Sequence, residues 1–228
     1  MKKIILVALC LMSLGSVWAQ KRVGEFSVIP RVGLNMSNLG DCNIYTTENE
    51  QLKSRIRPDF MLGADVECQL LEPLGVSIGA FYSRQGCRWP DFSEECITDD
   101  KSKVTSSIME QACNLQYINI PVSAKLYAND FISFHAGAQA GILLDAKYHY
   151  VISDLKEPVE GDKEFTSDTH NEKMQNMNSV VWSIPLGASL EYQNVIVDVQ
   201  YSFPLSRFNK LISNGGNRVW TFSVGYRF

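Results

Sequence analysis

Apolar and polar residues alternate with a period of two along most of this chain, and no helical period runs through the residues after position 19. Such alternation indicates strands whose two faces meet different surroundings. In the last segment one face carries Trp220, Phe222, Val224, Tyr226 and Phe228, with Thr221, Ser223, Gly225 and Arg227 opposite. We predict eight strands, over residues 26–36, 60–71, 74–85, 117–127, 131–150, 180–192, 195–205 and 219–228.

The connections between these strands alternate between short and long. Tight turns are predicted at 72–73, 129–130 and 193–194. Longer loops are predicted at about 37–58, 86–114, 151–178 and 207–217. The pattern describes an up-and-down meander with its tight turns at one end. Outer-membrane barrels have this asymmetry, with short periplasmic turns and long extracellular loops, so both termini are expected in the periplasm.

The apolar face of each predicted strand is almost free of charge, and this favours a membrane barrel over a soluble one. A soluble protein could not expose eight such faces to water. In lipid the pattern is stable, and ring closure leaves no unpaired strand edge. Ten residues of a tilted strand rise about 23 Å, close to the apolar band of roughly 25 Å. We therefore predict an all-β fold, a closed eight-stranded antiparallel up-and-down transmembrane barrel, with outer-membrane lipid around it.

The polar faces carry charges of both signs, which we expect to form a barrel-interior charge network. Paired charges are tolerated in such an interior, whereas isolated ones are costly. An eight-stranded barrel is just wide enough for packed side chains, so diffusive transport is disfavoured. The predicted network consists of Arg31, Asp65, Glu67, Lys125, Asp145, Lys147, Glu191, Asp198 and Arg227.

Aromatic residues lie at two kinds of informative position. Five tyrosines fall near the apolar ends of strands, where an aromatic girdle would sit, although ordinary strand composition also explains them. They are Tyr82, Tyr127, Tyr148, Tyr192 and Tyr226. The chain also ends on an aromatic residue in an alternating strand, which resembles the signal read by the barrel-assembly machinery during biogenesis. The predicted assembly signal is Phe222, Val224, Tyr226 and Phe228.

The first residues have the pattern of a secretory signal peptide. Lys2 and Lys3 precede an apolar stretch over residues 4–14, and Val17-Trp18-Ala19 provides a cleavage site before Gln20. We therefore expect a signal peptide at 1–19 and an outer-membrane β-barrel domain at 20–228.

Five cysteines remain after the predicted cleavage, and an exported chain meets an oxidising compartment. An odd number leaves at least one thiol free or paired with another chain. Cys87 and Cys113 flank the second long loop and could form a disulfide at its base, and Cys96 could pair with Cys42. Cys68 falls on an apolar face and is expected to be free. No paired C-x-x-C units occur, so no zinc site is predicted.

Composition excludes several classes of function. The formal charge of −4 argues against nucleic-acid binding, and a mean hydropathy of −0.09 argues against a bundle of membrane helices. His149 near Asp145, and His170, are the candidates for rim catalysis. No G-x-S-x-G, H-E-x-x-H or glycine-rich phosphate loop occurs, so we expect no enzyme activity, cofactor or metal ion. The acidic long loops could attract cations or a basic partner, but solvation alone explains them.

The stretch 115–122, LQYINIPV, is followed by Lys125, and the chain ends on Gly-Tyr-Arg-Phe. With the glycine-rich strand near 137–141 and Tyr201-Ser202, these residues resemble the PorT-like outer-membrane β-barrel domain family over about 26–228. The resemblance implies an outer-membrane location and a fold similar to small barrels of the OmpA and OmpX type, without a shared catalytic site.

Three functions are open at this point. We expect a structural or binding role, with long extracellular loops presented to ligands or partner proteins. The alternative is an accessory, PorT-like component of a secretion or envelope-assembly complex, with an envelope protein as its partner. A barrel enzyme with its site at the rim is the third.

Overall fold

The computed structural model describes residues 23–46, 49–97, 102–157, 162–212 and 215–228. The predicted signal peptide at 1–19 lies outside the described residues. In the described part of the chain, no helix is long and apolar enough to cross a membrane.

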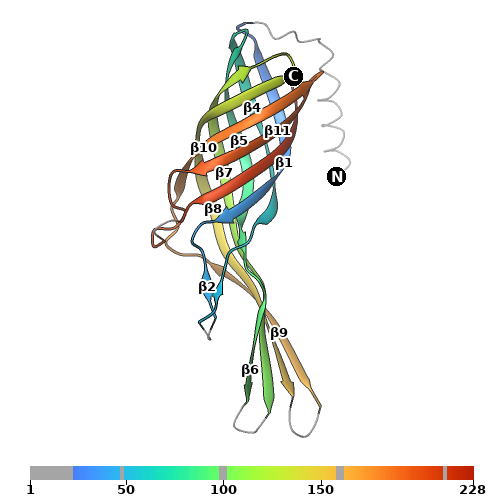
Figure 1. Cartoon of the computed structure of the whole chain (residues 1–228), viewed down its shortest axis with the longest axis vertical. Coiled ribbons are helices and arrows are strands. Elements are labelled where there is room, and N and C mark those ends of the chain that lie inside the picture. Colours follow the sequence, from blue (N-terminus) through green and yellow to red (C-terminus); the bar gives the residue numbers. More distant parts are fainter. Residues whose placement is uncertain (1–22, 47–48, 98–101, 158–161, 213–214) are drawn as a thin grey trace.

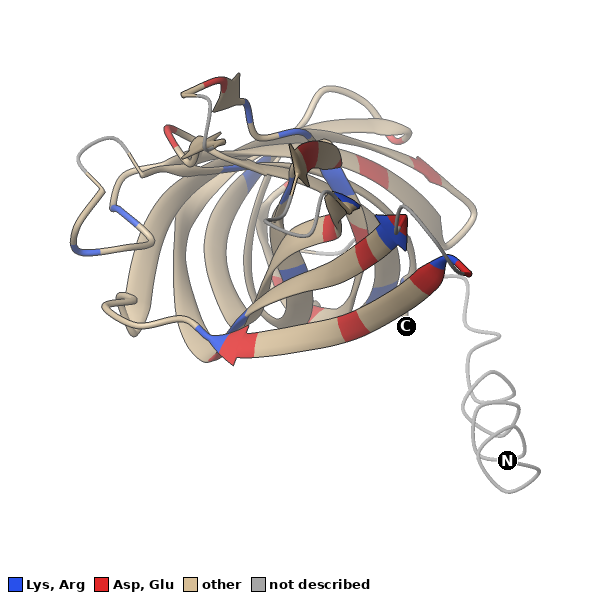
Figure 2. Ribbon diagram, turned by 90° about the horizontal axis from the view of Figure 1, so that it is seen from below, with Lys and Arg blue, Asp and Glu red and all other residues tan. Residues whose placement is uncertain are grey.

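Eight long antiparallel strands form a closed ring. They are β1 (Phe26–Leu39), β4 (Arg57–Leu71), β5 (Leu74–Arg88), β7 (Lys103–Tyr127), β8 (Ile132–Glu157), β10 (Val180–Tyr192), β11 (Val195–Pro204) and β12 (Asn217–Tyr226). The order around the ring is β7-β5-β4-β1-β12-β11-β10-β8, and β8 pairs with β7 to close it (Figures 1 and 2). The predicted closed eight-stranded antiparallel barrel is confirmed.

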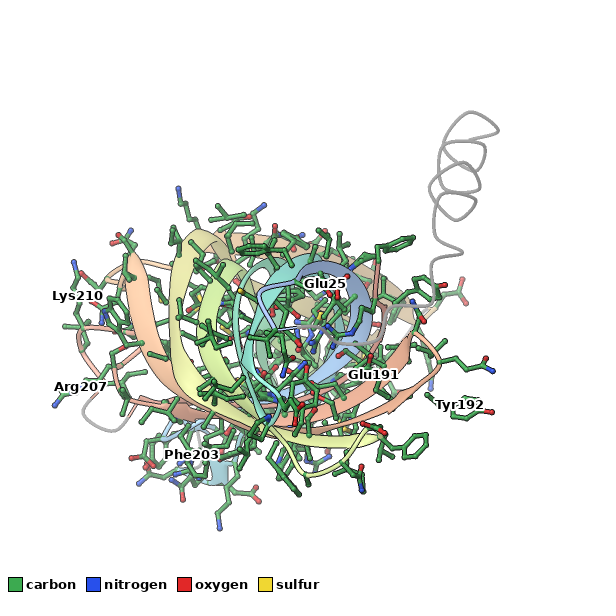
Figure 3. The ribbon with its side chains drawn as sticks, turned by 90° about the horizontal axis from the view of Figure 1, so that it is seen from above. Glu25, Glu191, Tyr192, Phe203, Arg207 and Lys210 are labelled. Carbon is green, nitrogen blue, oxygen red and sulfur yellow. The ribbon has the colours of Figure 1, made fainter. Side chains whose placement is uncertain are left out.

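Side chains alternate between the two faces of the ring, as the sequence pattern predicts. Figure 3 looks along the barrel from the turn end and shows Glu191 on the inner side, while its neighbour Tyr192 points away from the ring. Apolar side chains stand exposed on the outer face. Examples are Val32, Leu34, Leu62, Val66, Ile78, Val122, Phe134, Leu186, Val199 and Phe222. The outer surface is therefore a continuous apolar belt.

Two of the predicted long loops are mostly strand. The expected loop at 86–114 contains the end of β5, β6 (Phe92–Ile97) and the first half of β7. The expected loop at 151–178 contains the end of β8 and β9 (Glu164–Lys173). β6 pairs with the outer half of β7, and β9 pairs with the outer half of β8. These four segments form an antiparallel sheet that projects beyond the ring, called here the ribbon (Figure 1, bottom).

The ribbon leaves the barrel at an irregularity in β7. The register against β8 shifts between Met109 and Ala112, and Glu110 adopts a positive φ of 55°. An extra residue of this kind bends the strand and increases its twist. Because β7 and β8 stay paired on both sides of the shift, the ribbon is a continuation of the barrel wall.

A second irregularity, in β8, changes which face of the strand carries two residues of the predicted charge network. Gln116 pairs with Asp145 but Tyr117 pairs with Leu143, so Leu144 is an extra residue on β8. Beyond it the alternation is reversed, and Ala146 is buried while Lys147 is exposed. A one-residue slip moves every later side chain to the other face. The prediction that Asp145 and Lys147 lie in the barrel interior is therefore wrong.

The first long loop contains a small hairpin, formed by β2 (Ile44–Tyr45) and β3 (Gln51–Leu52). Its far end returns along the barrel rim, where Arg55 forms a two-way backbone pair with Arg88 at the end of β5. The first loop is thereby held against β5.

Candidate functional site

The interior of the barrel is layered, and the layer next to the tight turns is charged. Glu67 on β4 accepts a hydrogen bond from Lys125 on β7 at 2.7 Å and another from Arg227 at 3.1 Å. Arg227 also forms an ion pair with Glu191 at 2.7 Å. Tyr127 donates a further hydrogen bond to Glu67. One buried carboxylate is thus shared by two cations and a phenol, the kind of complete pairing that makes buried charge tolerable.

A second charged layer lies at the middle of the barrel. Arg31 on β1 pairs with Asp65 on β4 at 2.7 Å and approaches Asp198 on β11 at 3.6 Å. Asp198 also accepts a hydrogen bond from Ser189 at 2.6 Å and lies 3.5 Å from His135. Seven of the nine predicted network residues are therefore brought together. His135 and Tyr127 join them, and their place on the same polar faces is the signal that could have identified them.

The third layer is polar without charge. Asn35 donates hydrogen bonds to Ser83 and to the backbone oxygen of Arg84, and it accepts one from Thr221. Gln85 donates to the same Ser83 hydroxyl. A cavity of about 50 Å³ runs between this layer and the one below. It has room for a few water molecules and for nothing larger, since one water needs roughly 10–15 Å³.

The loop end of the interior is filled by hydrocarbon and sulfur, in a cluster called here the apolar plug. Its buried members are Leu39, Leu52, Cys87, Trp89, Cys113, Leu115, Tyr117, Ala146 and Phe208. The first long loop supplies Leu52, the last supplies Phe208, and the barrel strands supply most of the others. The plug therefore closes the barrel mouth, and loops from different parts of the chain meet in it.

Two of the five predicted girdle tyrosines have other roles. Tyr127 is buried in the turn-end charged layer. Tyr148 packs on the apolar plug, edge-on to Trp89 at 5.7 Å between ring centroids. The girdle prediction is wrong for these two, because both face inward. Tyr82, Tyr192 and Tyr226 lie on the outer face, as a girdle requires.

The histidines proposed for catalysis are not assembled into a site. His149 contacts Asn171 at 2.9 Å and Glu110 at 3.6 Å, whereas Asp145 pairs with Lys147. The third candidate residue, His170, stacks on a tyrosine of the neighbouring strand. The structure does not place either histidine beside a nucleophile, in the part of the chain it describes.

The five described cysteines after the predicted cleavage site are all free thiols. Cys87 and Cys113 are register partners on β5 and β7, but the Cys113 thiol donates to the sulfur of Met174. The predicted Cys42–Cys96 pairing is wrong, because Cys96 is exposed on β6 while Cys42 packs against the plug.

The ribbon has two faces that are both partly apolar. Across its middle, Ser93, Ser107, Ser153 and Ser167 stand side by side on one face. Two pairs of this row are hydrogen-bonded, Ser93 to Ser107 and Ser153 to Ser167. Large apolar side chains also reach the surface, and Ile97 is 79% exposed and Phe165 67% exposed.

Ion pairs at the tip of the ribbon set the charge of its carboxylates. Lys163 donates a hydrogen bond to Glu157, which holds the pKa of Glu157 below its ordinary value. Lys103 forms a 2.8 Å pair with Glu95, and this hydrogen bond raises the pKa of Lys103. Glu157 and Lys103 therefore stay ionised at neutral pH.

A cleft of about 710 Å³ lies where the ribbon leaves the barrel. Arg55, Arg57 and Arg88 line it, together with Trp89 and the acidic residues Asp91 and Glu110. Arg57 pairs with Asp59 at 3.3 Å. Arg55 and Arg88 face each other on paired backbone, and neither has a carboxylate partner among the described residues. The lining of this cleft therefore carries three guanidinium groups and two carboxylates.

Comparison with a family model agrees with this architecture. A family model described as "Outer membrane protein beta-barrel domain" matches residues 18–209. A structure of Ail, the attachment invasion locus protein of Yersinia pestis, is similar at 16% identity and a TM-score of 0.45, over 91% of this chain and 100% of that chain. Neisserial surface protein A is similar at 11% identity and a TM-score of 0.36, over 89% and 95% of the two chains. No curated protein sequence matches the chain.

Proposed function

Because the chain belongs to the outer membrane protein beta-barrel domain family, we propose that it is a non-catalytic binding protein of the bacterial outer membrane. In this proposal the barrel is the anchor and the ribbon is the part that meets partner proteins. The tight turns and both termini face the periplasm, and the ribbon extends from the cell surface.

The observation that carries the proposal is the open ribbon. β9 has one neighbour among the described strands, β8, and β6 likewise pairs only with β7. An edge strand presents unpaired backbone N–H and C=O groups, to which an extended peptide can add as a further strand. β9 is ten residues long, which gives an added strand a full row of partners.

The side chains of β9 indicate what such a strand should carry. Glu164, Asp168 and Glu172 share one face of the ribbon, because they are four residues apart along β9, an even spacing. An added strand places every second side chain on that face. We therefore expect a partner segment with basic residues at alternate positions.

The binding test uses a synthetic ten-residue peptide of alternating lysine and threonine, with the full chain held in lipid nanodiscs. Binding should broaden or shift the amide signals of β9, and Asp168→Lys should weaken it. Asp154→Lys, on the same ribbon face but on the inner strand β8, is the matched control. A peptide with proline at every third position should not bind. Binding of both peptides with equal affinity would contradict strand addition.

Topology is tested with the chain's own exposed thiol. Cys96 lies exposed on β6, so a membrane-impermeant maleimide should label it on intact cells. A cysteine introduced by Asn129→Cys, in a tight turn, should react only after permeabilisation. Labelling in the reverse order would show that the ribbon faces the periplasm. Stable co-purification with a secretion complex would favour the accessory role instead.

A second binding candidate is the arginine cleft. Like charges on directly opposite residues of paired backbone repel, and an anion between Arg55 and Arg88 would remove that cost. Guanidinium groups also bind phosphate and sulfate in a bidentate manner. Titration with inorganic pyrophosphate should shift the side-chain Nε signals of both arginines. The double variant Arg55→Gln and Arg88→Gln should abolish the response, whereas Arg207→Gln should leave it unchanged.

A further inference from the structure

Five sulfur-containing side chains gather at the mouth of the barrel. Cys87 and Cys113 are buried members of the apolar plug, and Cys42, Met174 and Met177 pack against it. Within this group the sulfur atoms form two separate contacts. The thiol of Cys113 donates to the Met174 sulfur at 3.2 Å, and the side chains of Cys42 and Cys87 interact with each other.

This arrangement argues against the Cys87–Cys113 pairing that the sequence suggests. Cys87 and Cys113 have neighbouring backbones, but their thiols are directed to different partners. Cys42 comes from the first long loop, packs against the plug that contains Cys87, and is held by a hydrogen bond from Trp89, two residues after Cys87. We propose that Cys42 and Cys87 form a disulfide that fastens the first long loop to β5 across the barrel mouth.

The surrounding contacts hold the two cysteines in place without the bond. The indole Nε1 of Trp89 donates a 2.7 Å hydrogen bond to the backbone oxygen of Cys42. Arg55, at the far end of the same loop, exchanges two backbone hydrogen bonds with Arg88, the residue after Cys87. Two anchors from one loop thus bracket the two cysteines and hold this loop beside the end of β5.

The chemistry is ordinary thiol–disulfide exchange. The Cys42 thiolate attacks one sulfur of an oxidised disulfide donor, such as an oxidised periplasmic dithiol protein, and a mixed disulfide forms as the donor's first thiolate leaves. The Cys87 thiolate then attacks the Cys42 sulfur and releases the donor's second thiolate. Two protein thiols lose two electrons and two protons, and the donor disulfide becomes a dithiol.

The sequence suits a direct test, because trypsin places the five cysteines in five different peptides. Cleavage after lysine and arginine, but not before proline, gives peptides 32–53, 56–84, 85–88, 89–101 and 104–125. The full chain is isolated from outer membranes after blocking free thiols with N-ethylmaleimide, and is digested without reductant. We expect peptide 32–53 linked to 85–88, with blocked thiols in the other three. A link between 85–88 and 104–125, or blocked thiols in both 32–53 and 85–88, would overturn the proposal.

A second measurement tests what the bond does. Cys42→Ser and Cys87→Ser should lower the midpoint of heat unfolding equally, and the double variant should fall no further. Reductant should lower the wild-type midpoint to that of the variants and leave theirs unchanged. Cys68→Ser, on the outer face, is the matched control. Equal sensitivity of Cys42→Ser and wild type to reductant would show that a different pair is oxidised.

Discussion

The two ends of the barrel interior are filled by opposite kinds of side chain. Next to the tight turns, Glu67, Lys125 and Arg227 form a buried ionic cluster. At the loop end, Leu39 and Phe208 belong to the apolar plug. Both sets of side chains fill the interior, but only the ionic cluster depends on the directions of its hydrogen bonds.

This difference matches the scaffold at each end. Ion pairs in a dry interior are favourable only when every charge is paired with good geometry, and short turns between paired strands hold that geometry. Apolar contacts are non-directional, so long loops can adjust until they pack. In this barrel, directional contacts lie where the backbone is most constrained, and non-directional contacts lie where it is least constrained.

The largest expected effect comes from breaking the ionic end. Glu67→Gln leaves the cations of Lys125 and Arg227 facing each other without a carboxylate between them. We expect a loss of about 3–5 kcal/mol in the free energy of unfolding, because an unpaired buried charge is left behind. Urea unfolding in lipid vesicles, followed by tryptophan fluorescence, measures it. Glu72→Gln, at an exposed turn, should change nothing, and a loss below about 1 kcal/mol for Glu67→Gln would refute the shared-carboxylate description.

The second largest effect is expected from placing a charge on the outer face of a strand whose inner face already carries one. Asp198 on β11 is tolerated because it faces partners inside, whereas the next residue, Val199, faces outward. Val199→Arg should cost about 2–4 kcal/mol, since a cation near the middle of the lipid layer is poorly solvated. Val195→Arg, at the turn end of the same strand, should cost about 0–1 kcal/mol. The same unfolding measurement applies, and equal costs at both positions would contradict a lipid-facing belt.

A substitution at the apolar end should lower the free energy of unfolding by less than one at the ionic end. Leu39→Ala removes a fully buried side chain from the plug. We expect a cost of about 2–3 kcal/mol, near the low end for such changes, because the loops can partly close the space. Hydrogen exchange of residues 40–46 should accelerate at the same time. Leu34→Ala, facing outward on the same strand, is the control and should leave this exchange unchanged.

The independence of the two ends gives a smaller, sharper test. Glu67 lies level with Ser27 of β1, and Leu39 is twelve residues further along that strand, about 40 Å away. Effects at such a separation should add to within about 0.5 kcal/mol. The double variant Glu67→Gln with Leu39→Ala measures this. A larger deviation would mean that the two ends fold as one coupled unit.

The smallest effect concerns the ribbon tip, outside both ends. The pKa of Glu157 is lowered by its hydrogen bond from Lys163, so the contact is present above the ordinary carboxyl pKa and is lost as pH falls through the depressed value. Carboxyl ¹³C shifts should therefore titrate below the usual value of about 4.3. Lys163→Ala should return the midpoint to that value. An unchanged midpoint would show that Lys163 does not lower the pKa of Glu157.

Much of the barrel could be predicted because alternation is local information. A period of two assigns Arg31, Glu67 and Asp198 to the inside directly, wherever the register is regular. It also locates the outward rows, such as Val195, Val197 and Val199, from neighbouring residues alone. The closed ring then follows from the lack of any other way to satisfy strand edges in lipid.

The remaining features depend on partners that are distant in sequence. The extra residue at Leu144 is defined by the strand opposite, so Asp145 and Lys147 could not be placed from their own segment. The ribbon strands carry mixed side chains on both faces and show no clean alternation, so they read as loops. The plug joins Leu52 to Phe208, which only the folded topology brings together.

The pairing of β7 with β8, which resumes after each of its two irregularities, has a mechanical consequence. Together they span about 80 Å from the tight turn to the ribbon tip, at 25 residues of roughly 3.3 Å each. A pulling force applied at the tip runs nearly along both strands, so it loads many backbone hydrogen bonds in shear at once instead of opening them one by one. The tip is thus joined to the embedded wall by paired backbone, and tension on a partner bound there, as proposed above, would be transmitted to the membrane through β7 and β8.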